Sequence, residues 1–261
     1  MPGPLLTDRT AIVTGAARGL GEGIARAFAA HGCAVGLFSR DLASLESLAA
    51  EIRAEGGKAL AVAVDVTDAA AVEAASARVA AELGAVDILV NNAAIAPSAP
   101  FLEMSDAMRD AVLDTNVRGP WHCTRAVLGG MVERGFGRVI NISSVTGPLV
   151  SGKGMTAYGA SKGALSGFTR SLALEVAEHG VTVNAILPGS FDTPMLRALA
   201  EPRGSTPDAY VRELGATIPV GRLGTIEEMG ELAAFLASEH ARYITGAEIV
   251  MDGGNVIQEH K

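Results

Sequence analysis

Short apolar runs recur along this chain, and each is followed by a segment whose apolar residues repeat at helical spacing. The runs do not alternate between apolar and polar residues as half-exposed strands do. They therefore predict strands buried on both faces, as in a parallel sheet covered by helices. The predicted strands are Ala11–Val13, Ala34–Phe38, Ala59–Val64, Val86–Val90, Arg138–Ile142, Val181–Leu187 and Glu248–Met251.

Helical patterns fill the intervals between these strands. The clearest is Leu42–Ala54, where Leu42, Leu45, Leu48 and Ile52 share one face. The other predicted helices run from the glycine-rich segment after the first strand to about Gly32, from Thr67 and Asp68 to about Leu83, over Asp106–Glu133 with an irregularity at Gly119-Pro120, over Thr156–His179, and from a capping box at Thr225 and Glu228 to Ala237.

Strands that alternate with helices in this way predict an α/β fold, a doubly wound and mostly parallel sheet of the Rossmann type with about seven strands and helices on both faces. No linker divides the chain, so we expect residues 1–261 to form a single dinucleotide-binding and catalytic domain. We expect the segment at about 190–220 to form a mobile excursion over the sheet, because it contains four prolines. The four are Pro194, Pro202, Pro207 and Pro219.

Composition and charge narrow the class of protein. A formal charge of −8 argues against a nucleic-acid partner, which would favour a basic surface. No apolar run approaches the roughly 18–20 residues that span a bilayer, and the first residues lack a signal-peptide pattern. Cys33 and Cys123 have neither metal-ligand nor redox spacing and suit a reducing compartment. We expect a cytoplasmic protein with no membrane partner and no metal.

Three glycines, Gly15, Gly19 and Gly21, lie between the first strand and the first helix. Their spacing differs from the general G-x-G-x-x-G fingerprint, but the physical logic is related. Glycines permit a tight turn, and the free N–H groups of the helix N-terminus can bind a pyrophosphate. The turn predicts a nucleotide site, with a tight packing turn as the alternative.

Tyr158 and Lys162 are four residues apart in a predicted helix, so both lie on one face. A phenol with an ordinary pKa near ~10 is a poor base at neutral pH. A nearby ammonium favours the phenolate and lowers that pKa, which suits a general acid/base. The pair predicts proton-transfer chemistry, with a solvated helix face as the alternative.

Five motifs together resemble the short-chain dehydrogenase/reductase family, in the family's order and at nearly its spacing. The resemblance covers about Thr10 to Gly254 and implies an oxidoreductase that uses a nicotinamide cofactor and acts on a small carbonyl or alcohol. The motifs are Thr14–Gly21, Asn91–Ala94, Ser144, Tyr158–Lys162 and Pro188–Thr193.

The resemblance implies four catalytic roles. Tyr158 would be the general acid/base, and Lys162 would hold the nicotinamide ribose and lower the tyrosine pKa. Ser144 would hydrogen-bond the substrate carbonyl. Asn116 would hold a water molecule in a proton relay; its alternative is an asparagine that bonds backbone at the helix irregularity. Ser143 competes with Ser144, which is preferred because it directly precedes a Val-Thr-Gly turn.

The resemblance also implies the residues that contact the cofactor. Asp65 would meet the adenine, Asn92 the adenine ribose region and Thr193 the carboxamide, although Asp65 and Thr193 could instead be ordinary caps. The complete set is Gly15, Arg18, Gly19, Leu20, Gly21, Ser39, Arg40, Asp65, Val66, Asn92, Tyr158, Lys162, Pro188, Gly189 and Thr193.

Two features depart from the family's usual pattern. Ala94 stands where the family usually has glycine, which adds a methyl group near the cofactor. Ser144 precedes Tyr158 by one residue more than the commonest spacing, and the glycine-containing loop 147–155 can absorb this. Neither departure is expected to abolish binding.

The end of the second strand carries Ser39 and Arg40, where an acidic residue would hold both ribose hydroxyls of NAD. A guanidinium can pair with a 2′-phosphate, so we expect a preference for NADP(H), with NAD(H) possible. Arg18 would add a second cation. Asp41 is a complication, because a pair with Arg40 would weaken the phosphate site. Arg40 as a solvated surface residue is the alternative.

The leading interpretation is hydride transfer between NADP(H) and a carbonyl or secondary alcohol. Ser144, loop 147–155, Tyr158 and the excursion would form the pocket, with apolar walls that suit small to medium ketones, aldehydes or 3-oxoacyl groups; sugars and polyols stay open. Those walls would come from Phe191, Met195, Leu196 and Leu199.

Two other functions are weighed against this interpretation. A dehalogenase-type lyase on the same scaffold normally lacks the glycine turn and the lysine, and both are present here. A non-catalytic nucleotide-binding sensor or assembly protein would not need the intact set of catalytic residues.

The resemblance also implies a homotetramer, formed through the two long helices and the C-terminal strand region. Trp121 lies within the first of these helices and is expected to pack between helices rather than to bind a ligand.

Overall fold

The computed structural model of the chain describes residues 3–201 and 204–258. Seven strands form one sheet in the order β3-β2-β1-β4-β5-β6-β7, and every neighbouring pair is parallel. The fold is therefore the predicted doubly wound α/β sheet. The strands are β1 Thr10–Thr14, β2 Ala34–Ser39, β3 Lys58–Ala63, β4 Ile88–Asn91, β5 Gly137–Ile142, β6 Val181–Pro188 and β7 Glu248–Met251.

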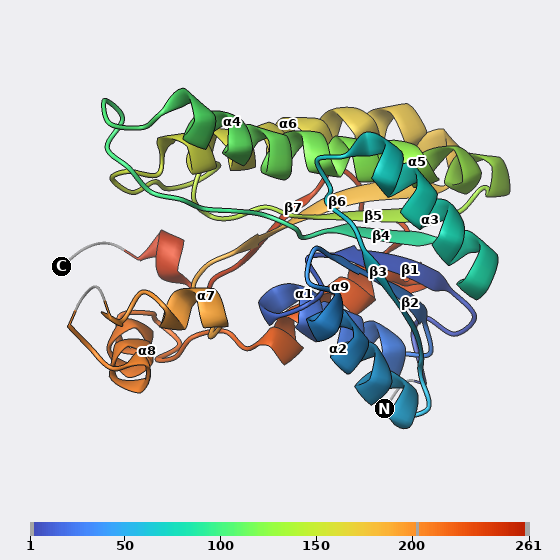
Figure 1. Cartoon of the computed structure of the whole chain (residues 1–261), viewed down its shortest axis with the longest axis horizontal. Helices are drawn as coiled ribbons and strands as arrows, with labels where there is room; N and C mark the ends of the chain where they lie inside the picture. The colour runs from blue at the N-terminus through green and yellow to red at the C-terminus, as the bar shows by residue number, and fades with distance from the viewer. Residues whose placement is uncertain (1–2, 202–203, 259–261) are drawn as a thin grey trace.

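Helices cover both faces of the sheet, which is why its strands are apolar on both sides. Figure 1 shows α1, α2 and α9 below the sheet and α3, α4, α5 and α6 above it. The helices are α1 Gly19–Ala30, α2 Leu42–Ala54, α3 Ala69–Leu83, α4 Asp106–Leu113, α5 Gly119–Arg134, α6 Thr156–Val176, α7 Pro194–Arg197, α8 Pro207–Ala216 and α9 Ile226–Ala237.

Alternate residues of the same strand enter separate cores on the two faces. On β1, Ala11 and Val13 pack with α1, α2 and α9, whereas Ile12 packs with residues of α3 and α5. Because a register error of one residue would exchange these two sets, the sheet has one well-specified register. The strand ends are fixed as a consequence, and the functional residues follow those ends.

The irregularity expected at Gly119-Pro120 lies just before these residues, as a π-helical turn at Asp114–Arg118 that separates α4 from α5. Pro120 lies in the first turn of α5, where its missing N–H leaves no helical bond unmade. The close approach of Gly119 to Val66 explains the glycine, since a Cβ at this position would lie 2.8 Å from Val66 Cγ2. The two adjacent residues therefore start a new helix after the π-helical turn.

Trp121 packs less closely between helices than the sequence predicted. Its ring lies 5.6 Å from the ring of Phe168 on α6, centroid to centroid, so a contact between helices is present. The residue is nevertheless 57% exposed, whereas the buried positions of α5 include Cys123, Val127 and Met131. Trp121 therefore lies on the outer surface formed by α5 and α6.

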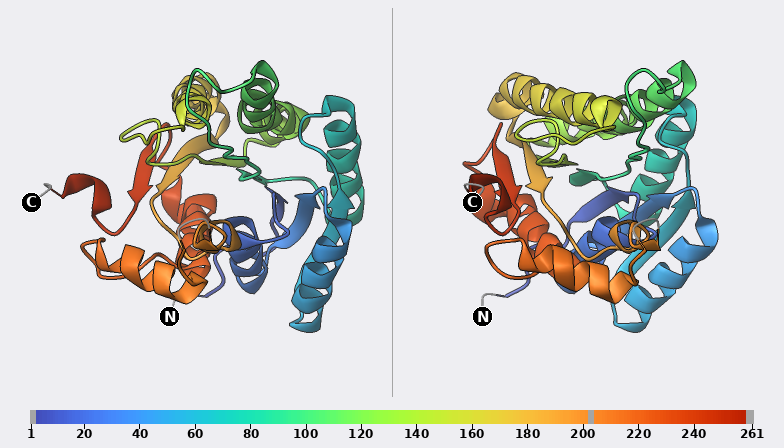
Figure 2. Two further views of the ribbon diagram at one scale, coloured as in Figure 1. Left: turned by 60° about the vertical axis from the view of Figure 1, so that its left-hand side comes forward. Right: turned by 90° about the vertical axis from the view of Figure 1, so that its left-hand side faces the viewer.

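The excursion is more regular than its four prolines suggest, because it contains α7 and α8. Both helices have proline in the first turn after a threonine N-cap, Thr193 or Thr206. Figures 1 and 2 show α7 and α8 together at one end of the sheet, near the end of β6. Pro202 lies outside the described residues. No helix in the described ranges is long and apolar enough to cross a membrane.

Candidate active site

The glycine-rich turn joins β1 to α1 and is held against the end of β4. Gly15 has φ +65°, a conformation that side chains other than glycine rarely adopt. Thr14 Oγ1 accepts hydrogen bonds from the backbone N–H groups of Asn92 (2.9 Å) and Ala93 (3.0 Å). Asn92 Nδ2 donates to the carbonyls of Thr14 (2.9 Å) and Gly15 (3.2 Å). The Asn92 amide thus fixes the turn.

Gly21 lies directly behind this turn. A Cβ on Gly21 would collide with the Gly15 carbonyl oxygen, so no side chain fits there. The start of α1 can therefore approach the turn closely and present its free N–H groups to the space in front of it. Such a cradle fits the pyrophosphate of a dinucleotide.

A cavity of about 400 Å³ lies in front of the cradle. It opens at the carboxyl ends of the strands, where the strand order reverses between β1 and β4, which is where doubly wound sheets bind ligands. Of the predicted site residues, Gly21 and Asn116 do not line it. Those that do are Gly15, Arg18, Gly19, Leu20, Ser39, Arg40, Asp65, Val66, Asn92, Ser144, Tyr158, Lys162, Pro188, Gly189 and Thr193.

Other lining residues were missed from the sequence, among them Phe38, Ile95, Thr115 and Ile142. Phe38 and Ile142 lie at the ends of β2 and β5. Because ligands bind at the carboxyl ends of strands in such sheets, this position could have predicted that both residues line the cavity. Thr115 lies on the π-helical turn, whose exact place the sequence pattern did not predict.

One end of the cavity is charged. Arg40 Nη1 lies 3.8 Å from Asp65 Oδ2. Asp65 Oδ1 accepts hydrogen bonds from the Thr67 backbone N–H (2.9 Å) and hydroxyl (2.8 Å), and the backbone bond contributes most to lowering the pKa of Asp65. Arg18 and Ser39 line the same end. Asp65 therefore acts as a local cap while it also pairs with Arg40.

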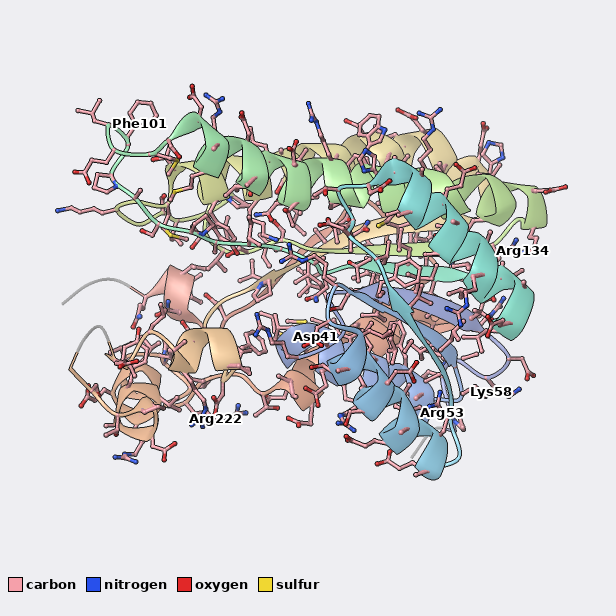
Figure 3. The ribbon with its side chains drawn as sticks, viewed as in Figure 1. Asp41, Arg53, Lys58, Phe101, Arg134 and Arg222 are labelled. Atoms are coloured by element: carbon pink, nitrogen blue, oxygen red, sulfur yellow. The ribbon has the colours of Figure 1, made fainter. Side chains whose placement is uncertain are left out.

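The pair considered between Asp41 and Arg40 does not form. Asp41 is the N-cap of α2, as Figure 3 shows, and it accepts hydrogen bonds from the Ser44 backbone N–H (3.2 Å) and hydroxyl (2.6 Å). These bonds hold its carboxylate at the unpaired N–H groups of the helix. Arg40 instead pairs across the sheet edge with Asp65.

The opposite end of the cavity contains Tyr158 and Lys162, both on α6. Lys162 is buried, its Nζ donates to the Ile142 carbonyl at 2.7 Å, and burial lowers its pKa to about 7. Lys162 Nζ lies 5.6 Å from the Tyr158 ring centroid. Burial raises the pKa of Tyr158, and a hydrogen bond with Ser144 opposes that rise. The net pKa is raised, contrary to the lowering expected from Lys162.

The two neighbouring serines after β5 have different partners. Ser144 Oγ accepts a hydrogen bond from the Thr146 backbone N–H (3.0 Å) and is the group bonded to Tyr158. Ser143 Oγ donates to the Lys162 carbonyl at 3.1 Å. Ser144 is thus the serine that adjoins the phenol, as expected.

Asn116 lies in the π-helical turn and bonds backbone, which was the alternative considered for it. Its Oδ1 accepts from the Ile95 N–H (2.9 Å), and its Nδ2 donates to the Ile95 carbonyl (2.9 Å) and Ser161 Oγ (3.0 Å). Ser161 Oγ in turn donates to the Tyr158 carbonyl at 2.7 Å. Asn116 therefore ties the first turn of α6 to the segment after β4.

The excursion contributes apolar side chains to the cavity lining. Phe191, Leu196 and Leu199 line it as expected, while the side chain of Met195 lies outside those described. Thr193 caps α7 through Oγ1, which accepts from the Leu196 N–H at 3.3 Å, and it also lines the cavity.

The two ends of the excursion are joined to each other. The Gly224 N–H donates to Ser190 O (3.1 Å), and the Asp192 N–H donates to Gly224 O (3.0 Å). A Cβ on Gly224 would lie 2.6 Å from the Phe191 ring, so glycine allows the ring to sit directly over the backbone. This contact defines a neck at residues 190–192 and 224.

Arg197 links three parts of the excursion through ion pairs. Its guanidinium makes two bonds with the Asp192 carboxylate, Nε to Oδ1 at 2.6 Å and Nη2 to Oδ2 at 2.8 Å. A third bond joins Nη1 to Asp208 Oδ1 at 2.7 Å. One side chain thus connects the neck, α7 and the start of α8.

A doubly wound sheet with a dinucleotide cradle and a Ser-Tyr-Lys cluster at one cavity defines a class of nucleotide-dependent oxidoreductases. Residues 15–255 match the family model described as "Enoyl-(Acyl carrier protein) reductase". The chain is 46% identical to oxidoreductase UcpA of Salmonella typhimurium over 97% of both chains. It is 37% identical to 3-oxoacyl-[acyl-carrier-protein] reductase FabG of Escherichia coli, over 94% of this chain and 96% of that protein.

The crystal structure of a single-residue variant of actinorhodin polyketide ketoreductase with NADPH matches with a TM-score of 0.91 and 34% identity, over 96% of this chain and 98% of that one. The chain belongs to the short-chain dehydrogenase/reductase family. It is an oxidoreductase of a family that uses NAD(P)H and acts on small molecules.

Proposed function

We propose that this protein transfers a hydride between NADP(H) and a carbonyl or secondary alcohol, with Tyr158 as the general acid/base. The observation that carries the proposal is the convergence of Ser144, Tyr158 and Lys162 on the cavity that also contains the glycine cradle. A non-catalytic nucleotide-binding sensor would need the cradle but not a buried lysine beside a serine-bonded phenol.

When bound, the nicotinamide supplies or accepts the hydride; the chain's own residues manage the substrate oxygen and its proton. Ser144 Oγ accepts a bond from the Thr146 N–H and is also hydrogen-bonded to Tyr158, so a substrate oxygen placed between Ser144 and Tyr158 would take over the Ser144 hydroxyl proton. In reduction, Ser144 would bond the substrate oxygen while Tyr158 gives it a proton. The raised pKa keeps the phenol protonated at neutral pH, so Tyr158 is ready to act as an acid.

Lys162 would hold the nicotinamide ribose hydroxyls. Its Nζ has three donors and uses one on the Ile142 carbonyl, so donors are left for this role. Asn116 would act as a positioning residue, because it fixes the turn of α6 that carries Tyr158 through Ser161. The predicted relay water would lie beside Asn116.

The proposed preference for NADP(H) over NAD(H) rests on the charged end of the cavity. Arg18, Ser39 and Arg40 offer two cations and a hydroxyl to a 2′-phosphate. Arg40 is paired with Asp65 at 3.8 Å, too long for a strong bond, so a phosphate can compete for it. The similar ketoreductase was crystallised with NADPH, which supports the same choice.

For the substrate we propose small to medium ketones, aldehydes or 3-oxoacyl groups. The apolar side chains of Phe191, Leu196 and Leu199 line the same cavity as Ser144, Tyr158 and Lys162. The relative named as a 3-oxoacyl-[acyl-carrier-protein] reductase acts on a substrate of this chemistry.

The direct test follows the loss of reduced cofactor by absorbance, with NADPH and NADH each offered against a panel of carbonyl compounds. We expect turnover of apolar ketones or 3-oxoacyl thioesters, with NADPH preferred. Binding of NADPH without turnover of any carbonyl or alcohol would favour the sensor function. Equal turnover with both cofactors would contradict the NADP(H) preference.

We also propose a homotetramer assembled through α5 and α6 and through the β7 region. Trp121 (57%) and Leu174 (84%) are exposed on α5 and α6, and Tyr243 (100%) and Ile257 (86%) near β7. Light scattering should give four times the chain mass of 26.6 kDa. Trp121→Glu should reduce that mass, and a monomeric wild type would contradict the proposal.

A further inference from the structure

We propose that Ser143 is a positioning residue that fixes Lys162, so that the last residue of β5, Ile142, and the residue after it, Ser143, hold both ends of this lysine. The inference rests on the proposed function for its catalytic meaning, but the contact itself can be tested without turnover.

The two contacts grip opposite parts of Lys162. Ser143 Oγ donates to its backbone carbonyl at 3.1 Å, and the Ile142 carbonyl accepts from its Nζ at 2.7 Å. Ser143 is itself anchored, because its N–H donates to the Ile186 carbonyl of β6 at 2.8 Å. The lysine is thus tied to the end of the sheet and not only to its own helix.

Ser143 cannot take the role proposed for Ser144 while it makes this bond. A serine hydroxyl has one proton, and that proton is used on the Lys162 carbonyl. Although Ser143 lines the cavity, it is therefore a support for Lys162 and not a donor to substrate. The two serines therefore have different roles: Ser144 contacts the Tyr158 phenol, and Ser143 holds Lys162.

Besides the bond to the Ile142 carbonyl, few contacts restrain the Lys162 ammonium, so the position of the Lys162 backbone matters. Among the described residues no acidic side chain makes an ion pair with Nζ, and Tyr158, on the same helix, is the titratable group that faces it. On the π-helical turn packed against α6, Asp114 and Arg118 pair with each other at 2.8 Å. On β5, the buried Arg138 pairs with Glu239. Burial alone therefore sets the lowered pKa of Lys162.

Loss of the Ser143 hydroxyl should let the first turns of α6 move and admit water to Nζ. The lysine pKa should then rise toward its ordinary value, by about 0.5–1 unit. The rate of the proposed reaction should fall roughly tenfold, because small misplacements of catalytic groups have large effects on rate. Loss of a serine hydroxyl bond far from the site should change neither the Lys162 pKa nor the rate.

The test compares Ser143→Ala with Ser238→Ala. Ser238 is equally buried and does not line the cavity; its hydroxyl donates to a helix carbonyl, that of Phe235, at 2.7 Å and accepts from the His240 N–H at 3.2 Å, so its loss is at least as disruptive locally. The chain has four lysines, Lys58, Lys153, Lys162 and Lys261. Lysine labelled with ¹³C at Cε therefore gives few NMR signals, and Lys162→Arg assigns the one that titrates near pH 7.

We expect Ser143→Ala to raise the titration midpoint of Lys162 and to lower kcat, and Ser238→Ala to leave both unchanged while the two variants lose similar thermal stability. An unchanged Lys162 midpoint in Ser143→Ala would overturn the inference, whatever its activity. Because the NMR titration needs no substrate, absence of carbonyl turnover would count against the proposed function alone.

Discussion

The two ends of the cavity are built by different physical means. At the proposed catalytic end, which contains Ser144, Tyr158 and Lys162, the side chains of Lys162 and Ser144 are buried and bonded to neighbouring groups at 2.7–3.1 Å. At the charged end, the side chains of Arg40 and Asp65 are 76% and 43% exposed and lie 3.8 Å apart. One end is a desolvated hydrogen-bond network, and the other is a loose surface ion pair.

This difference predicts how each end responds to change. Polar groups in a buried network depend on one another, because an unpaired buried group is costly. Exposed ion pairs contribute little to stability and are screened by salt. Substitutions at the catalytic end should therefore act on rate, and those at the charged end on cofactor choice.

The largest effect is expected from Tyr158→Phe, which removes the phenolic proton and keeps the ring. We expect kcat for carbonyl reduction to fall by about 10²–10⁴-fold with NADPH affinity nearly unchanged. Tyr243→Phe is the control, since Tyr243 does not line the cavity and the substitution keeps its ring at the proposed interface. Steady-state rates and cofactor fluorescence titration measure the two quantities. Full activity in Tyr158→Phe would remove Tyr158 from the mechanism.

The second-largest effect is expected in the pH dependence of the reduction rate, which depends on residues of the catalytic end. Burial lowers the pKa of Lys162 to about 7 and raises that of Tyr158. As pH rises through 7, the lysine loses its charge while the phenol keeps its proton. The reduction rate should therefore fall by up to about tenfold per pH unit above 7. A profile that stays flat to about pH 9 would show that a charged Lys162 is not required.

The charged end should show its effect in the ratio of the two cofactors. Arg40→Ala should raise the KM for NADPH about tenfold and leave that for NADH unchanged, since the lost partner would be the 2′-phosphate. Asp65→Asn should shift the ratio the other way by freeing Arg40. Arg53→Ala is a matched control, because Arg53 also pairs with a carboxylate, that of Glu46, at 3.8 Å, and it lies in the last turn of α2, outside the cavity lining (Figure 3). A loss of NADH use equal to that of NADPH would contradict this role.

The smallest effect is expected in the excursion. Exposed ion pairs hold the excursion, whereas buried hydrogen bonds hold the catalytic end. Arg197→Gln should raise the KM for the carbonyl about 2–5-fold with little change in kcat, because its bonds hold the apolar wall in place. Arg109→Gln removes a similar arginine bonded to Asp106 and Asp110, both at 2.8 Å, outside the cavity lining. If both variants gave the same KM, the bonds of Arg197 would have no role in substrate binding.

Local pattern was enough to predict the sheet and most of its helices. Apolar runs located strands to within a residue or two, as for Ala34–Phe38 against β2 at Ala34–Ser39. The capping box at Thr225 and Glu228 is present as predicted, because cap and partner are only three residues apart. Periodicity and caps are local, so a single sequence contains them.

Partner choice between distant residues could not be predicted in the same way. Arg40 pairs with Asp65 and not with its neighbour Asp41, because the Asp41 carboxylate is already bonded at the helix N-terminus. Asn116 bonds Ile95, 21 residues away, only after a π-helical turn has rotated it. Ser143 and Ser144 look alike in sequence, and their separate partners depend on where α6 crosses the end of β5.

The neck of the excursion has a consequence for how such proteins can diversify. Residues 190–192 and 224 bond to each other, so the chain enters and leaves the excursion at nearly one point. A change in the segment after Thr193 and before Gly224 would leave the glycine turn, Ser144, Tyr158 and Lys162 in place, because none of them lies in that segment. The proposed catalytic residues and the proposed substrate wall therefore lie in separate parts of the chain.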